Sequence, residues 1–318
     1  LRNSSAASDV YKRQPFMFDF DALINCFGMA SCAVNQLTSG LIIGMLLFLV
    51  ASGLTLIFGV LNVINFAHGT FYMVGAYFAF STYLFTESYL LSAFVGALGA
   101  GIFGIFFERV LISKVYGQDI LMQLLVCYAF ILITDDLVKL IWGTDYIAMG
   151  IPDGFRLAPF RIFGGYVPPL YAFLIILSLI IGILTILLIS KTRFGSIVRA
   201  AAENSPMVSA LGIRVPLYFA LLFGLGCALA GIAGALAAPV RSLTPGMGFG
   251  ILIESFIVTV IGGMGSIPGA LIAAIILGLT RSIGSVGFPL FVDGLMFLIM
   301  AIVLIFKPTG LFVKGSSK

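Results

Sequence analysis

The sequence has 318 residues, of which 61% are hydrophobic and 9% are charged. Ordinary soluble domains carry roughly 25% charged residues, so the composition excludes that class and predicts a polytopic membrane protein. The net charge of +4 comes mostly from short loops and the C-terminal end, and without a basic stripe it does not predict nucleic-acid binding. At roughly 20 apolar residues per crossing, the chain has no room for a separate soluble catalytic domain.

The first 16 residues are left out of the predicted fold. Residues 1–14 are polar and Ser-rich, and no apolar stretch of about 7 to 15 residues follows Lys12 and Arg13 as it would in a signal peptide. We interpret residues 1–16 as a non-native or disordered leader and Met17 as the native start. Residues 17–318 are then one transmembrane domain with a polar loop at 191–214.

The cysteines do not predict a metal site, because the four of them include no CxxC pair and the chain has a single histidine. Cys26 and Cys32 lie near the start of the domain and are able to form a disulfide if that end faces an oxidising compartment. The sequence leaves the alternative of two free thiols open. Cys127 and Cys227 are predicted to be small core residues.

Apolar runs predict an all-α polytopic membrane fold with about nine hydrophobic segments, in a range of eight to ten. The run at 251–263 is too short to cross a bilayer at about 1.5 Å per residue, and it joins the next run through GGMGSIPG at 262–269. This pair predicts a broken or re-entrant helix. A loose internal sequence similarity between 56–79 and 260–279 would suit a transporter built on pseudo-symmetry. The runs are 37–61, 64–85, 90–107, 119–142, 168–190, 215–238, 251–263, 266–284 and 288–306.

The positive residues predict the orientation, because Lys and Arg favour the cytoplasmic side in short loops. They gather in the loops 108–118 and 191–214 and in the C-terminal tail, which we therefore place in the cytoplasm. Counting segments back from the first of these loops places the N-terminal end outside. The loop 143–167 departs from the pattern, since it carries Arg156 and Arg161.

Two asparagines and a histidine interrupt the apolar stretch 53–80, namely Asn62, Asn65 and His68. An unsatisfied polar side chain in hydrocarbon costs on the order of several kcal/mol, so the segment is expected to line a protein-walled cavity or to break its helix. If the segment is helical, the spacing i, i+3, i+6 places the three residues along one inward face. We interpret them as transport-pathway candidates, although a histidine here is more often a satisfied packing residue than a gate.

Charged residues inside or next to the apolar runs allow competing interpretations. Glu254 is the only carboxylate that we place inside a run and away from an interface. It either neutralises a substrate ammonium or pairs with Arg241 or Arg281, and we favour the pair. In the polar loop, Arg199 and Glu203 are spaced i, i+4 and are expected to stabilise one helical turn.

The loop 190–216 predicts a short amphipathic helix. Asn204 or Ser205 is suited to cap it, Pro206 suits its first position, and Gly212 fits the left-handed residue that ends a helix. A helix lying across the membrane face is suited to a groove on a cytoplasmic partner. The alternative is a plain amphipathic linker.

Three stretches carry a family resemblance, namely GLTLIFGVLNVINFAHGTFYMVGAYFAF at 53–80, RAAAENSPMVSALGI at 199–213 and GGMGSIPGALIAAIILG at 262–278. Together they resemble the permease subunits of ABC importers for branched-chain amino acids. The resemblance covers about residues 37–312, and the first and third motifs are shared with amide and urea permeases. It implies a permease domain over 17–318 whose loop at 191–214 couples it to ATPases. The chain itself would bind no ATP or other cofactor, while the partner ATPases use ATP and Mg²⁺.

The resemblance also implies roles for residues, while no catalytic residue is predicted. The loop matches the family signature that contacts the ATPase at Ala201, Glu203, Asn204 and Gly212, but the stricter EAA version found in other importers is absent. The ATPase-coupling candidates are Arg199, Ala201, Glu203, Asn204, Ser205, Pro206 and Gly212. The transport-pathway candidates are Asn62, Asn65, His68, Gly69, Glu254, Gly262, Gly263 and Gly265.

The partners implied by the resemblance are a second homologous permease subunit, two cytoplasmic ATP-binding subunits and a periplasmic or extracellular substrate-binding protein. The chain would lie in the lipid bilayer of a bacterial or archaeal cytoplasmic membrane and move substrate by ATP-driven alternating access. One alternative is an ABC permease for urea, short amides or another small polar solute. The other is an ion-coupled secondary transporter, which also uses broken helices. Asp135 and Asp136 give it little support, because their spacing to Lys139 predicts a local ion pair.

Overall fold

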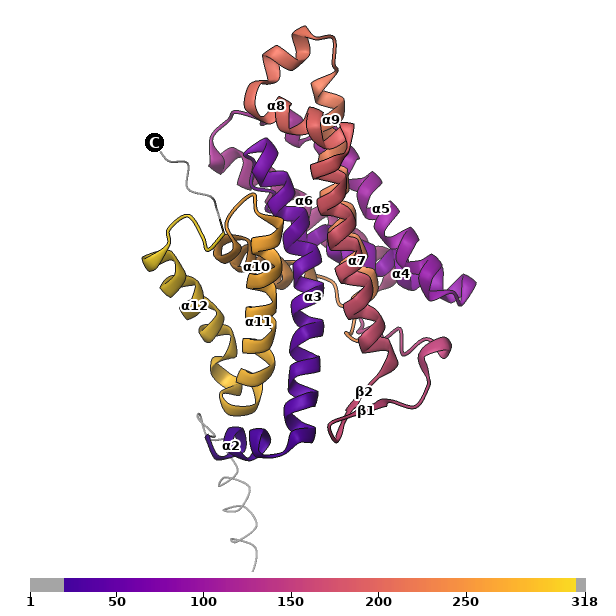
Figure 1. The fold of residues 1–318 in the computed structure, drawn as a ribbon. Helices are drawn as coiled ribbons and strands as arrows, with labels where there is room; N and C mark the ends of the chain where they lie inside the picture. The colour runs from indigo at the N-terminus through magenta and orange to yellow at the C-terminus, as the bar shows by residue number, and fades with distance from the viewer. Residues whose placement is uncertain (1–19, 313–318) are drawn as a thin grey trace, which may run out of the picture.

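The computed structural model of the protein describes residues 20–312, and the predicted leader at 1–16 lies outside them. The described chain is mostly helical (Figure 1). Its elements in chain order are α2 (Phe20–Gly28), α3 (Ala30–Leu61), α4 (His68–Thr86), α5 (Tyr89–Val110), η1 (Ile112–Lys114), α6 (Ile120–Trp142), η2 (Asp153–Phe155), β1 (Phe160–Ile162), β2 (Gly165–Val167), α7 (Pro169–Lys191), α8 (Arg193–Ala210), α9 (Val215–Ala237), α10 (Met247–Gly262), α11 (Ile267–Gly287), η3 (Pro289–Phe291) and α12 (Val292–Phe306).

Each predicted apolar run coincides with one helix, in the order α3, α4, α5, α6, α7, α9, α10, α11 and α12. Within residues 20–312, six helical stretches are long and apolar enough to cross a membrane, and α10 is apolar but shorter, with 16 residues. The helical, polytopic class is therefore confirmed, whereas nine crossings stay a prediction. The sequence did not predict α2 or the antiparallel β1–β2 hairpin.

Prolines and glycines set several helix ends. Pro169, Pro216 and Pro268 lie in the first turns of α7, α9 and α11, where the missing N–H would have no helical partner in any case. The turn between α10 and α11 needs a backbone that L side chains rarely adopt, because φ is 96° at both Gly263 and Gly265. The predicted break therefore falls where glycine is required.

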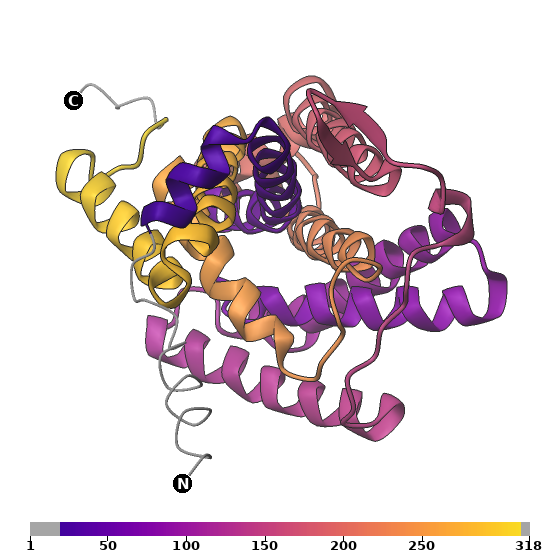
Figure 2. The ribbon, with the colours of Figure 1, turned by 90° about the horizontal axis from the view of Figure 1, so that it is seen from below.

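The central helices are α3 and α9, and α7 and α12 lie at the periphery (Figure 2). In their most apolar windows, 83% of α3 and 72% of α9 is buried, against 22% of α7 and 11% of the stretch that contains α12. The exposed side chains of the peripheral helices are largely apolar, for example Ile183, Leu184 and Ile305. A broad apolar surface of this kind is suited to contact with lipid.

Glycines let the central helices approach each other backbone to backbone. Gly53 of α3 lies against Gly226 of α9, where an added Cβ on Gly226 would be 2.9 Å from the Gly53 carbonyl oxygen. Gly69, near the start of α4, meets Gly248, near the start of α10, in the same way. Small residues stabilise such crossings in lipid, because the hydrophobic effect does not drive spans together there.

The chain repeats one arrangement in α3–α4 and α9–α10. In each pair a long helix is followed by a non-helical segment, 62–67 or 238–246, and then by a shorter helix. α3 starts at the end of the molecule that carries α2, whereas α9 starts at the opposite end that carries α8 (Figure 1). The two pairs are therefore inverted. The internal sequence similarity between 56–79 and 260–279 does not follow this structural repeat, because it relates the end of α3 to the end of α10.

The two ends of the molecule differ in charge, and we call them the α2 end and the α8 end. Tyr89 at the start of α5 donates to the carbonyl oxygen of Leu236 at the end of α9, so α5 runs antiparallel to α9 and brings Arg109 to the α8 end. A hollow lined by both Arg199 and Phe312 places the end of the described chain there too. The described parts of the three positively charged regions therefore share one end, as the sequence predicts.

A disulfide joins Cys26 of α2 to Cys32 of α3, with their Cα atoms 5.2 Å apart. It closes the turn between the two helices at the α2 end. The choice that the sequence left open is thus decided in favour of the bond. Cys127 and Cys227 are free and buried, as predicted.

Candidate functional site

The coupling candidates lie on α8, which is kinked in the middle. Its backbone leaves the helical conformation at Asn204, with φ −149° and ψ 83°. The Asn204 side chain accepts a hydrogen bond from the backbone N–H of Met207 at 3.0 Å, and Pro206 lies between them. Gly212 has a φ of 82°. The second half of α8 is therefore the predicted short helix. Asn204 rather than Ser205 caps it, Pro206 lies in its first turn, and Gly212 ends it in a left-handed conformation.

The second half of α8 presents apolar side chains on the surface. Val208 is buried against Ala201 and Val215, but Met207 and Leu211 are 63% and 73% exposed. Large apolar side chains with this exposure mark an interaction surface. Four coupling candidates are exposed around them, namely Glu203, Asn204, Pro206 and Gly212.

The predicted pair between Arg199 and Glu203 is not formed. The Arg199 guanidinium donates instead to the carbonyl oxygen of Ile189 near the end of α7, and none of the ion pairs in residues 20–312 includes Glu203. The last carbonyl groups of a helix lack helical partners and attract positive side chains. Arg199 therefore ties α8 to α7 and leaves Glu203 on the surface.

The polar stretch at 62–68 breaks the helix, so its polar residues do not share one helical face. α3 ends at Leu61, Asn62 follows in a left-handed conformation with φ 51°, and α4 begins at His68. Asn62 is exposed, whereas Asn65 and His68 are fully buried. The arrangement expected of a continuous helix is therefore wrong, and the alternative of a break is confirmed.

In each of the two buried polar residues, Asn65 and His68, one side-chain atom has a hydrogen-bond partner and the other has none among the described residues. Nε2 of His68 lies 3.0 Å from the Val50 carbonyl oxygen, which links the start of α4 to the middle of α3. Oδ1 of Asn65 accepts from the Ala67 N–H at 3.1 Å. His68 Nδ1 and Asn65 Nδ2 are buried without a hydrogen-bond partner in the described part of the chain. Asn65 also lines a cavity of about 340 Å³ whose other walls are apolar.

The glycine candidates of the third stretch, Gly262, Gly263 and Gly265, lie elsewhere, in the turn between α10 and α11 at the α8 end. Gly265 packs against Gly59 of α3 and lines a hollow of about 550 Å³ together with Arg199. Gly69 instead lies at the crossing with α10. The structure therefore separates the predicted pathway residues into two places and does not assemble them into one site.

A further cavity of about 270 Å³ lies between α3, α4, α7 and α10, nearer the α2 end. Its lining includes a stripe of α3 with Ile42, Leu46 and Val50, and also Tyr72 and Arg241. A smaller cavity of about 120 Å³ shares Tyr72 and Arg241 with it and is also lined by Glu254. The two cavities therefore meet at the two polar side chains.

Glu254 pairs through Oε1 with Arg281 of α11, which confirms the favoured interpretation. Its Oε2 atom is buried and has no hydrogen-bond partner in residues 20–312. Arg241 lies in the segment 238–246 and lines both cavities together with Tyr72, and no described carboxylate pairs with it. The sequence treated Arg241 only as an alternative partner of Glu254, because nothing local shows that its segment reaches a cavity.

Comparison with known proteins identifies the family of this chain. Residues 36–305 match the protein family described as "Branched-chain amino acid transport system / permease component". The match includes α8 and every pathway candidate. The chain belongs to this permease family.

Three relatives of the permease are similar over most of its length. The high-affinity branched-chain amino acid transport system permease protein BraD of Pseudomonas aeruginosa is 30% identical over 291 residues, covering 87% of this chain and 95% of BraD. The permease proteins LivH of Escherichia coli and of Salmonella typhimurium are each 30% identical over 293 residues, covering 87% of this chain and 94% of LivH. No solved structure matches the permease.

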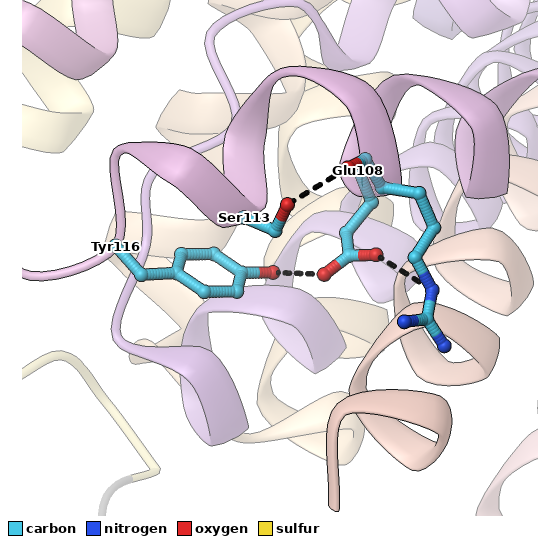
Figure 3. A network of polar contacts seen from close by, with 4 residues as sticks. Glu108, Ser113 and Tyr116 are labelled. Carbon is cyan, nitrogen blue, oxygen red and sulfur yellow. Dashed lines mark hydrogen bonds and ion pairs between the residues drawn. The ribbon is translucent and has the colours of Figure 1, made fainter.

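One buried carboxylate in the permease was missed by the sequence analysis. Glu108, near the α8 end of α5, accepts a hydrogen bond from the Tyr116 hydroxyl at 2.9 Å and lies 3.8 Å from the Arg109 guanidinium (Figure 3). Ser113 donates to the Arg109 carbonyl oxygen in the same network. Burial raises the pKa of Tyr116, and the negative charge of the neighbouring Glu108 carboxylate raises it further. The network fixes the turn that leads from α5 to α6.

Two ion pairs of the described residues join residues that are three apart in the sequence. Asp136 pairs with Lys139 at 2.9 Å, so the predicted local ion pair is confirmed. Within residues 20–312, no group of three or more His, Cys, Asp or Glu side chains is placed to hold a metal ion. That the chain binds no cofactor stays a prediction.

Proposed function

We propose that this chain is the membrane-spanning permease subunit of an ABC importer for branched-chain amino acids, in a bacterial or archaeal cytoplasmic membrane. The observation that carries the proposal is the family match over residues 36–305. The relatives are named as permease proteins of high-affinity branched-chain amino acid transport systems. The α8 end faces the cytoplasm, since its short loops carry the Lys and Arg residues.

Two cytoplasmic ATP-binding subunits supply ATP hydrolysis and hold ATP and Mg²⁺, and a groove on one of them receives the second half of α8. The exposed Met207 and Leu211 support this docking, because a short amphipathic helix is recognised through apolar anchors. Glu203 and Gly212 lie on the same exposed part of the chain. A substrate-binding protein docks at the α2 end, and a second homologous permease completes the pathway.

Transport follows alternating access, in which ATP-dependent closure of the ATPases moves α8. Arg199 transmits this movement to α7, because its guanidinium binds the Ile189 carbonyl oxygen. The short helices α4 and α10 respond at the contact of Gly69 with Gly248. Discontinuous helices of this kind surround the substrate path in other transporters. The remaining candidates Asn62, Asn65, His68, Gly262, Gly263 and Gly265 belong to the moving segments.

Uptake of radiolabelled leucine into proteoliposomes tests the proposal. The vesicles hold this chain with or without its co-encoded permease, ATPases and receptor, and ATP is supplied on the ATPase side. Uptake only by the complete, ATP-loaded assembly is expected. Uptake by the chain alone along an ion gradient, or a complete assembly that carries urea but not leucine, would refute the proposed function.

A further inference from the structure

We infer that the two adjoining cavities at Arg241 form a binding site for the zwitterionic α-amino-acid group of a substrate with an aliphatic side chain. The inference rests on the proposed function and goes beyond it, because it assigns the permease its own substrate site, separate from the soluble receptor. Arg241 receives the carboxylate, Glu254 receives the ammonium, and the wall formed by α3 receives the side chain.

The carboxylate position follows from the surroundings of Arg241. The residue is half-buried, lines both cavities, and has no carboxylate partner among the described residues. A charged side chain within a membrane protein normally pairs or faces a functional cavity. The guanidinium offers a planar fork of donors that matches a carboxylate. Tyr72 lines both cavities as well, and its hydroxyl is a second donor available to a carboxylate.

The ammonium position follows from the unsatisfied oxygen of Glu254. Arg281 binds Oε1 and leaves Oε2 buried without a donor. A buried carboxylate oxygen without a partner costs stability, and a substrate ammonium would supply the missing hydrogen bond. Glu254 lines the smaller cavity together with Arg241. The smaller cavity is therefore lined by one residue that donates to a carboxylate and by another whose unbonded oxygen, buried in this structure, is an acceptor for an ammonium.

The side-chain position follows from the composition of the larger cavity. Ile42, Leu46 and Val50 recur at i, i+4 and i+8 on α3, and Ile251 of α10 lines the same space. These are branched aliphatic side chains, so this part of the wall stabilises an aliphatic group, while the polar groups of the lining are Ser39, Tyr72, Tyr171 and Arg241. The volume of about 270 Å³ lies just below the roughly 300 to 1,000 Å³ of common small-molecule sites, which suits a single amino acid.

The site is tested by equilibrium binding of radiolabelled leucine to the purified assembly of permeases and ATPases, with the receptor left out. Wild type is expected to bind leucine saturably. Leucinamide, which lacks the carboxylate, and 4-methylpentanoate, which lacks the ammonium, should each compete about 10- to 100-fold more weakly, because each loses a hydrogen bond to a charged group. Competition by either analogue as strong as that of leucine would overturn the inference, as would the absence of saturable leucine binding.

The substitution Arg241→Gln should weaken leucine binding about 10- to 100-fold and leave leucinamide binding unchanged, since the amide does not use the positive charge. Arg241→Lys should give an intermediate loss. Arg161→Gln is the matched control, because it removes one positive charge from the exposed β1 strand at the same end. Equal losses for leucine and leucinamide in Arg241→Gln would mean a structural role and would refute the assignment.

The two proposals fail in different ways. If the complete wild-type assembly imports no leucine, the proposed function is wrong. If it imports leucine through its receptor but the receptor-free assembly binds none, the function stands and the binding site is wrong. The analogue measurements need only the wild-type protein, so they decide the question even if an Arg241 variant fails to fold.

Discussion

Adding one methyl group at the crossing of α4 and α10 should destabilise the permease. In Gly248→Ala the new Cβ would lie 2.6 Å from the Gly69 carbonyl oxygen, 2.8 Å from the Gly69 carbonyl carbon and 3.0 Å from the Thr70 nitrogen. Real Cβ contacts are seldom closer than 3.4 Å. Because all three neighbours are backbone atoms, no side-chain rotation relieves the contact, and the two helices must separate by roughly 0.8 Å.

Overpacking of this kind costs about 1 to 3 kcal/mol. Gly250→Ala is the matched control, because its Cβ would meet nothing within 4 Å on the same helix and Ala is favoured over Gly in a helix by about 0.5 to 1 kcal/mol. Because both substitutions lie in α10 and gain the same helix propensity, the two variants should differ by the overpacking cost, about 1 to 3 kcal/mol. The assay is the midpoint of denaturant unfolding of the purified assembly in detergent. Equal midpoints for Gly248→Ala and Gly250→Ala would refute the backbone contact.

Three other predictions concern coupling, the pathway and the thiols. Gly212→Val should abolish the stimulation of ATPase activity by the receptor without preventing membrane insertion, because Gly212 has a φ of 82° and a left-handed β-branched residue is strained. Gly117→Val, at φ 75° in another loop, is the control, and equal loss in both variants would indicate general misfolding. Asn65→Leu should reduce leucine uptake while ATPase stimulation persists, since the change removes a buried polar group from an otherwise apolar cavity; wild-type uptake would exclude Asn65 from the pathway. Maleimide should label none of the four cysteines in the folded chain, two after denaturation and four after denaturation with reduction, because two are free and buried and two are bonded. Four labels without reductant would contradict the disulfide.

Features that depend on a few neighbouring residues were predicted well. Asn204, Pro206 and Gly212 lie within nine residues of one another, and their roles in capping, starting and ending a helix are local properties of the backbone. The glycine turn after α10 is local in the same sense. The positions of the helices were predicted as well, because apolar runs of this length are distinctive.

Features that depend on distant parts of the chain were not predicted. The exposed Asn62 and the buried His68 differ because α4 starts beside the middle of α3, and that position is set by the Gly69 contact with Gly248, about 180 residues away in the sequence. The cavity at Arg241 joins side chains of α3, α4, α7 and α10. The partner of Arg199 was mistaken for a similar reason, since the carbonyl group that it binds belongs to the preceding helix.

The disulfide between Cys26 and Cys32 has a consequence for how the chain is made. Such bonds form in oxidising compartments and are rare where thiols are kept reduced. If the α2 end lies outside the cell membrane, both thiols stay reduced until that end has been exported. The bond then forms between two cysteines that are only six residues apart in the sequence. The oxidation state of this pair therefore records whether α3 of a newly synthesised chain has been inserted in the correct direction.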